Sequence, residues 1–339
     1  MLSRFRGSLL AGACGDALGY PIEFYRYSSI VSRFGEGGLK NMILSDGKAE
    51  ISDDTQMDIY TAQGLIHAHE KHCDYNDTII EIHKSYYRWY NGQENGLSYQ
   101  MKKLYSVNEI ENDDLIVDAT HSALTANRAP GSTCLSALSS GKMGTTTTSL
   151  NDSKGCGGIM RIGCIPICYW NNPELAYQYA VDASALTHSH ILGYTSSGAL
   201  AMIISYIYQG KSLHDSIQLT LEYLRTDSSN DFLIQVIENA VNTADNGLVG
   251  KEAFSILGEG WVAEETLAIG LWAALMYPTD LKKALLASVN HSGDSDSTGC
   301  VCGYIMGAML GEDAIPSEWL KNLELRDLII EQAEKLASF

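Results

Sequence analysis

Apolar residues recur at the spacing of one face of an α-helix along most of the chain. Helices are predicted at residues 3–19, 54–71, 76–91, 117–128, 132–140, 173–186, 189–209, 211–225, 230–244, 261–277 and 279–290, and a further apolar run extends from Cys300 to Leu310. No stretch alternates apolar and polar residues over a strand's length. Residues 25–50, which are rich in glycine and lack a period, are predicted to form a long loop. The pattern predicts an all-α protein in which residues 1–339 form one compact many-helix domain.

Composition and charge exclude some classes of function. Lys and Arg number 23 against 41 Asp and Glu, so the formal net charge is -18, which argues against a nucleic-acid-binding surface. An acidic protein can still bind an anionic small molecule where helix N-termini or a metal supply a local positive field. The eight cysteines have no CxxC spacing, so we expect free thiols and a cytoplasmic location. We also expect a monomer. A membrane span is not expected, because no run reaches ~20 apolar residues.

Two clusters of carboxylates and hydroxyls stand at predicted helix starts, at residues 52–55 (Ser-Asp-Asp-Thr) and 294–297 (Asp-Ser-Asp-Ser). Ser and Asp are common N-cap residues, so one interpretation is capping alone. A cap needs only one oxygen, however, and neighbouring carboxylates repel each other unless a cation lies between them. Two such helix starts facing one another would supply hard oxygen ligands suited to Mg²⁺ or Mn²⁺. We therefore predict a metal site built from both clusters.

Asp16 and Glu23 stand at the end of the first predicted helix, which Gly19 and Pro21 should terminate. Asp16 lies in an apolar stretch and needs a partner if it is buried. Glu23 has large apolar neighbours that could raise its pKa, as a proton-transfer residue requires. The alternative is that Glu23 is a solvated loop residue.

A glycine-rich segment at residues 151–161 precedes another apolar stretch. Its backbone N–H groups could hold an anion, although the spacing of a P-loop is absent. A flexible linker or a close helix crossing is the alternative. His188 lies at the junction of two predicted helices, where a histidine is more often structural than catalytic.

Taken together, these motifs resemble the ADP-ribosylglycohydrolase family. The matching signatures are Gly-Asp with a Glu seven residues later (Asp16, Glu23), Ser52-Asp53-Asp54-Thr55, Ser153-Lys154-Gly155-Cys156-Gly157-Gly158 with Met160-Arg161, Leu186-Thr187-His188, and Gly293-Asp294-Ser295-Asp296-Ser297. They occur in the family's order across residues 7–311. Ser52 and Ser297 stand where many members have Thr, and a Ser hydroxyl can bind a metal equally well.

The resemblance implies an all-α orthogonal bundle that holds two divalent ions, Mg²⁺ or Mn²⁺. The implied metal ligands are Ser52, Asp53, Asp54, Asp294, Asp296 and Ser297. The implied substrate-binding residues are Asp16, Ser153, Gly155, Cys156, Gly157 and His188. Glu23, Asp53 and Asp296 are the implied catalytic residues.

The resemblance also implies a substrate and a reaction. Members act on ADP-ribosylated proteins or small ADP-ribose conjugates and release ADP-ribose. We expect ADP-ribosyl-arginine, because residues 153–157 are similar to arginine-type members; serine, O-acetyl and polymer linkages are alternatives. In the expected mechanism the metals orient the distal ribose and activate water for attack at its anomeric carbon, while Glu23 transfers a proton or positions the leaving group. Two other classes stay open, a phosphohydrolase that would release AMP and a non-catalytic ADP-ribose-binding protein.

Overall fold

The computed structural model describes residues 1–95, 99–116 and 119–339, which fold into helices joined mainly by short turns. The α-helices are α1 Leu2–Gly19, α2 Tyr27–Phe34, α3 Asp53–Glu70, α4 Tyr75–Tyr90, α5 Tyr99–Leu104, α6 Val107–Glu111, α7 Ser132–Ser139, α8 Ile165–Cys168, α9 Pro173–Ala185, α10 Ile191–Tyr208, α11 Leu213–Leu224, α12 Asp231–Asp245, α13 Gly250–Leu257, α14 Ala263–Met276, α15 Leu281–Val289, α16 Ser295–Leu310, α17 Ser317–Asn322 and α18 Arg326–Ala337. Short 3₁₀ or π segments are η1 Tyr20–Ile22, η2 Asn91–Asn95, η3 Ala119–Leu124, η4 Cys156–Arg161, η5 Ser228–Asn230 and η6 Glu312–Ala314. Within these ranges only isolated bridges and no strand occur. The all-α prediction is confirmed.

Most predicted helices agree with observed ones to within a few residues at each end. The matching helices are α1, α3, α4, α7, α9, α10, α11, α12, α14, α15 and α16. The prediction of a loop over residues 25–50 is wrong in part, because α2 lies within it. This helix has eight residues and buries only Ile30, so its apolar period is too short to recognise in the sequence.

The helix predicted at residues 117–128 is also wrong over its described part. Residues 117 and 118 lie outside the described residues, and the rest contains only the 3₁₀ segment η3. Its backbone leaves helical geometry at His121, with φ -101° and ψ 16°. The ring Nδ1 of His121 lies 2.6 Å from the carbonyl oxygen of Leu115. The segment therefore turns back towards the preceding residues instead of continuing as a helix.

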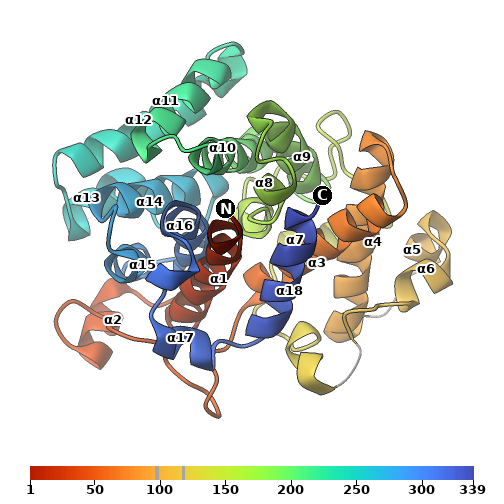
Figure 1. The fold of residues 1–339 in the computed structure, drawn as a ribbon, viewed down its shortest axis with the longest axis horizontal. Helices are drawn as coiled ribbons and strands as arrows, with labels where there is room; N and C mark the ends of the chain where they lie inside the picture. The colour runs from red at the N-terminus through yellow and green to blue at the C-terminus, as the bar shows by residue number, and fades with distance from the viewer. Residues whose placement is uncertain (96–98, 117–118) are drawn as a thin grey trace.

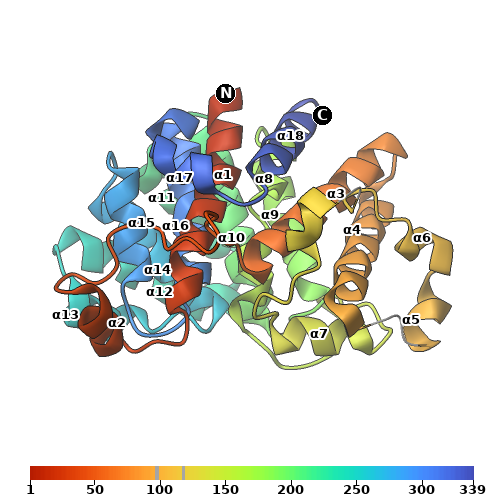
Figure 2. The ribbon, with the colours of Figure 1, turned by 90° about the horizontal axis from the view of Figure 1, so that it is seen from below.

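α1 and α16 run antiparallel through the centre of the molecule, in direct backbone contact (Figures 1 and 2). A Cβ on Gly15 would lie 2.0 Å from the carbonyl oxygen of Gly299, and a Cβ on Gly307 would lie 2.0 Å from that of Gly7. A Cβ at either of these glycines would overlap the facing backbone, so the close contact requires glycine there. The pairing brings the C-terminal end of α1 beside the N-terminal end of α16.

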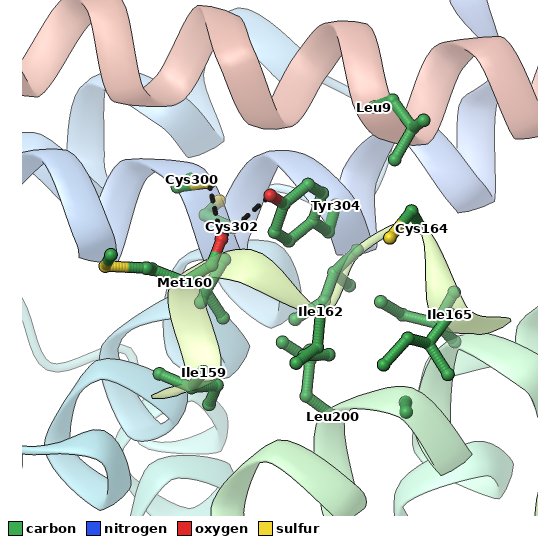
Figure 3. Packing of buried hydrophobic residues seen from close by; sticks show 14 of the residues in the cluster. Leu9, Ile159, Met160, Ile162, Cys164, Ile165, Leu200, Cys300, Cys302 and Tyr304 are labelled. Carbon is green, nitrogen blue, oxygen red and sulfur yellow. Dashed lines mark hydrogen bonds between the residues drawn. The ribbon is translucent and has the colours of Figure 1, made fainter. Parts of the chain in front are cut away.

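Tyr304 of α16 fixes the segment η4 against this central pair (Figure 3). Its hydroxyl donates to the carbonyl oxygen of Met160 at 2.8 Å, and the Cys300 thiol donates to the same oxygen at 3.5 Å. A Cβ on Gly12 or Gly163 would lie 2.3 or 2.2 Å from a ring carbon of Tyr304, so the ring fills the space between two glycines. The segment that follows the glycine-rich loop is therefore held in a fixed position relative to α1 and α16.

Other helices cover the central pair on both sides. α14 and α15 pack on α16, while α3 and α18 pack on α1, and α4 lies beyond α3 (Figure 1). α10 is long and apolar enough to cross a membrane by length and composition alone. Because 83% of its apolar window is buried inside the fold, it has the pattern of a core helix.

Candidate active site

One cavity of about 350 Å³ lies where several helix ends and loops meet. It is lined by Glu23, Phe24, Asp53, Asp54, Ala129, Pro130, Gly131, Ser132, Thr133, Cys134, Gly155, Cys156, Gly157, Met160, His188, Trp261, Asp294, Asp296 and Ser297. The N-terminal ends of α3 and α16 therefore face the same space. Two motifs 242 positions apart in the sequence are brought together because α1 packs on both α3 and α16.

The start of α3 contributes two buried carboxylates. Ser52 is the N-cap, and its hydroxyl accepts a hydrogen bond from the Asp54 N–H at 3.2 Å. Oδ2 of Asp53 accepts one from the Gly131 N–H at 3.0 Å. Asp54 is only 2% exposed, and its Oδ2 has no hydrogen-bond partner. Capping explains Ser52, but it leaves Asp54 with a buried oxygen that costs free energy unless a ligand satisfies it.

The start of α16 contributes two more carboxylates, next to Glu23. Oδ1 of Asp294 and Oδ1 of Asp296 both accept hydrogen bonds from the Ser297 N–H, at 3.2 and 3.0 Å. Glu23, Asp294 and Asp296 each offer one oxygen within 4.8 Å of the others. Three carboxylates at this separation repel one another strongly, and a divalent cation between them would remove that repulsion.

Asp16 lies behind the cavity and organises the start of α3. Both of its oxygens accept a hydrogen bond from the Ser52 N–H at 3.0 Å, and Oδ2 also accepts from the N–H and the hydroxyl of Thr55. Asp16 is fully buried near the end of α1. Its negative charge at the N-terminus of α3 is favoured by the exposed N–H groups there. The Gly-Asp motif thus links the central helix to the carboxylates of α3.

Glu23 is held at the edge of the cavity by a strained turn. Its Oε2 is buried without a hydrogen-bond partner, which disagrees with the alternative of a solvated side chain. Phe24 has a left-handed φ of 67°, an uncommon conformation for a residue other than glycine. Its ring stacks on that of Trp261, with the centroids 5.4 Å apart. The aromatic contact therefore fixes the segment that carries Glu23 to the opposite side of the cavity mouth.

The crowded carboxyl groups raise one another's pKa. Burial is the main cause of the raised pKa of Glu23, to about 11, and repulsion by Asp296 comes next. The same two causes raise the pKa of Asp16 to about 7. Burial also raises the pKa of Asp54, again followed by repulsion from Asp296. Without a cation, the cluster retains protons that ordinary carboxyl groups would lose.

The glycine-rich segment approaches the cluster from the other side. The Cys156 N–H donates to the carbonyl oxygen of Trp261 at 3.3 Å, and Lys154 forms an ion pair with the buried Glu264. The hydroxyl of Ser153 accepts a hydrogen bond from the Gly155 N–H at 3.2 Å. These contacts hold the segment against the start of α14.

His188 reaches the same cavity as a neutral ring. Arg161, fully buried, donates to the Thr187 hydroxyl at 2.7 Å, and this hydroxyl lies 2.9 Å from Nδ1 of His188. Nε2 points towards Gly157, where a Cβ would lie 3.1 Å away. Burial, followed by the Arg161 charge, lowers the pKa of His188 to about 3. The ring is therefore neutral.

Comparison with known proteins identifies the family. The family model described as ADP-ribosylglycohydrolase matches residues 1–338. This chain belongs to the ADP-ribosylglycohydrolase family. The members of this family are enzymes that hydrolyse bonds to ADP-ribose, which sets the general class of reaction.

Relatives cover almost the whole chain at low identity. An uncharacterized protein from Archaeoglobus fulgidus is 24% identical over 99% of this chain and 96% of its own length. ADP-ribosylhydrolase ARH1 of Dictyostelium discoideum is 22% identical over 98% and 93%, and ADP-ribosylarginine hydrolase Tri1 of Pseudomonas putida is 25% identical over 99% and 78%. A solved structure of an ADP-ribosylglycohydrolase-related protein complex matches with a TM-score of 0.64, at 23% identity over 99% of this chain and 98% of that one. The likeness confirms the fold.

The site residues expected from the sequence fall into two groups in the structure. Those that line the cavity are Glu23, Asp53, Asp54, Gly155, Cys156, Gly157, His188, Asp294, Asp296 and Ser297. Asp16, Ser52 and Ser153 lie behind them and hold the backbone of these motifs. The metal-binding, substrate-binding and catalytic roles of the residues in both groups stay predictions.

Sequence reasoning missed several cavity residues of this family member. Phe24 and Trp261 meet only in the folded chain, and residues 129–134 carry no recognisable motif. Ala129, with φ 56°, lines the cavity and shares the left-handed conformation of Phe24. No local sequence pattern indicates such contacts, because they depend on which segments the helices bring together.

Proposed function

We propose that this protein is a metal-dependent hydrolase that cleaves the glycosidic bond between ADP-ribose and an arginine side chain of a modified protein. The observation that carries the proposal is the cavity in which two helix starts and Glu23 present five carboxylates. A glycine-rich segment lines the same cavity. This combination supplies both a cation site and a site for a sugar linked to a diphosphate.

The donor set fits hard divalent ions. Buried oxygens of Asp54 and Glu23 have no partner among the described residues, and Glu23, Asp294 and Asp296 converge. Carboxylate and hydroxyl oxygens are the ligands that Mg²⁺ and Mn²⁺ prefer. We propose as ligands Ser52, Asp53, Asp54, Asp294, Asp296 and Ser297, for two ions. When bound, such ions supply Lewis-acid activation and orientation of the sugar hydroxyls.

The chain's own residues carry the remaining steps. Glu23 protonates the leaving nitrogen or positions it, because its side chain lies at the edge of the cavity beside Asp294 and Asp296. The carboxylates of Asp53 and Asp296 stabilise the positive charge that develops on the anomeric carbon. Nε2–H of His188 and the backbone N–H groups near Gly157 donate to the ribose and the diphosphate.

Two observations favour arginine as the acceptor. The Pseudomonas putida relative, which aligns with 99% of this chain, is named as an ADP-ribosylarginine hydrolase. The stacked rings of Phe24 and Trp261 at the cavity mouth are 65% and 38% exposed. A planar, cationic guanidinium is attracted to the faces of such rings. Serine, O-acetyl and polymer linkages lack this group, although other relatives are named ADP-ribosylhydrolase ARH3 without a stated linkage.

A linkage panel tests the proposed substrate. The protein with Mg²⁺ is incubated with ADP-ribosyl-arginine peptide, ADP-ribosyl-serine peptide, O-acetyl-ADP-ribose and poly(ADP-ribose), and kcat/KM is measured for each. We expect the arginine linkage to be cleaved at least about tenfold faster than the others, and Trp261→Leu to reduce this preference. Faster cleavage of another linkage overturns the assignment to arginine, and binding without turnover overturns the enzymatic function.

A further inference from the structure

Cys156 places a sulfur atom inside the carboxylate cluster. Its Sγ lies 2.7 Å from Oδ2 of Asp294, and it also interacts with the Ser297 hydroxyl. Cys156 lines the cavity between the glycine-rich segment and the start of α16 and is partly exposed to it. A thiol is a soft ligand, unlike the oxygens that surround it.

A second feature of the same cluster indicates where a cation would lie. Asp54 is 98% buried, lines this cavity, and its Oδ2 has no partner. Cys156 and Asp294 line the same cavity. A cation bound in this cavity would satisfy the unpartnered oxygen of Asp54.

The distances allow one ion to contact both atoms. Zinc lies about 2.3 Å from a thiolate sulfur and about 2.0–2.2 Å from a carboxylate oxygen in proteins. A tetrahedral ion at these distances holds its sulfur and oxygen ligands about 3.6 Å apart, so the Cys156 and Asp294 side chains rotate apart from their 2.7 Å contact when the ion binds. The thiol donates its hydrogen to Asp294 in the absence of metal, and this proton is released to solvent when the ion binds.

We propose that Cys156 is a sulfur ligand of this metal site for soft and borderline ions such as Co²⁺, Zn²⁺ and Cd²⁺. The inference rests on the proposed function only in that the carboxylate cluster holds a divalent ion. The mixed sulfur and oxygen set binds these ions more tightly than oxygen alone would, whereas Mg²⁺ gains little from sulfur. Cys156 thus determines the metal selectivity of the site.

Cys134 provides a matched control in the same cavity. It also lines the cavity, but its thiol is fully buried and donates to the carbonyl oxygen of Gly157 at 3.9 Å. Its sulfur also accepts a hydrogen bond from Arg161 at 3.5 Å, so the thiol already has a positively charged side chain as a partner. The same substitution at the two positions therefore separates a ligand from a structural thiol.

The test is an anaerobic titration of the full-length, metal-free protein with Co²⁺ and Cd²⁺. Absorbance reports thiolate-to-metal charge transfer, and calorimetry reports affinity for these ions and for Mg²⁺. We expect the charge-transfer band in the parent and in Cys134→Ser, and its loss in Cys156→Ser. Affinity for Cd²⁺ should fall about 10–100-fold in Cys156→Ser, with a much smaller change for Mg²⁺.

The outcomes distinguish this inference from the proposed function. Binding of Co²⁺ to the parent without a charge-transfer band overturns the sulfur ligand and leaves the metal site intact. Absence of any divalent-ion binding overturns the metal-dependent function as well. A band that persists in Cys156→Ser also overturns the inference, because another sulfur is then responsible. Circular dichroism checks folding, and Cys156→Ala replaces the serine variant if that one unfolds.

Discussion

Single side chains in this site are positioned by backbone groups from distant segments. Asp16 accepts a hydrogen bond from the Ser52 N–H, and Asp53 accepts one from the Gly131 N–H. The sequence indicated which residue types carry chemistry, because carboxylates two apart at a helix start are hard to explain by capping alone. It could not show that Asp16 lies behind the cavity, since that depends on how α1 packs.

Glu23 gives the clearest prediction at this scale. Glu23→Gln keeps the shape of the side chain but removes the proton that the mechanism uses, so kcat should fall by about 10²–10⁴-fold. Mg²⁺ affinity should change much less, because four other carboxylates remain. Steady-state kinetics and calorimetry on the one variant measure both quantities. The exposed Glu36→Gln is the control, and an unchanged kcat in Glu23→Gln would refute the role in catalysis.

Metal affinity depends on the carboxylates of the two helix starts. Asp296→Asn removes one charge from the converging cluster, so we expect Mg²⁺ or Mn²⁺ affinity to fall at least about tenfold. Calorimetry is the measurement, and the exposed Asp313→Asn serves as the control for a charge change far from buried carboxylates. Equal affinities in the two variants would place the ions elsewhere.

At the scale of elements, the central contact between α1 and α16 aligns the site. Long helices with a sustained apolar period were predicted nearly to the residue, whereas the short α2 was missed and residues 117–128 were assigned wrongly. The helical repeat is a local property that a sequence displays directly. The close approach of two helix backbones is not local, although the regular glycines in both helices are consistent with it.

Gly303 tests how tightly these two helices are held. A Cβ at this position would lie 2.1 Å from the carbonyl oxygen of Ala11, so Gly303→Ala must push α1 and α16 apart. We expect the free energy of unfolding to fall by about 1–3 kcal/mol or more. Chemical denaturation measures it, with Gly92→Ala as the control because an added Cβ there would meet no atom nearer than 3.4 Å. Equal stability of the two variants would contradict the tight contact.

Repulsion among buried carboxyl groups makes the stability of the whole molecule depend on pH. The folded-state pKa is raised to about 7 for Asp16 and about 11 for Glu23, above their unfolded values of about 3.9 and 4.3. Between the unfolded and the folded pKa of each group, the folded state binds more protons than the unfolded state, so the free energy of unfolding falls as the pH rises. The contribution of these two groups to the free energy of unfolding is fully present below about pH 4. It is lost as the pH rises through about 7 for Asp16 and about 11 for Glu23.

This linkage predicts the thermal behaviour of the protein. The Tm of the metal-free protein should decrease between pH 5 and 8, and added Mg²⁺ should raise the Tm most at the high end of that range. Thermal denaturation in EDTA and in Mg²⁺ across a buffer series at constant ionic strength measures both effects. A Tm that rises with pH in EDTA, or that ignores Mg²⁺, would be inconsistent with unneutralised buried carboxyls.

The most direct test of the central claim is the identity of the products with and without metal. An ADP-ribosylated arginine peptide is incubated with the protein in Mg²⁺ and, separately, in EDTA, and all products are identified by mass spectrometry. The proposed function predicts intact ADP-ribose and unmodified peptide in Mg²⁺, and neither in EDTA. AMP with a phosphoribosylated peptide would show that the pyrophosphate is cleaved instead, and equal ADP-ribose release in EDTA would show that the carboxylate cluster acts without a metal.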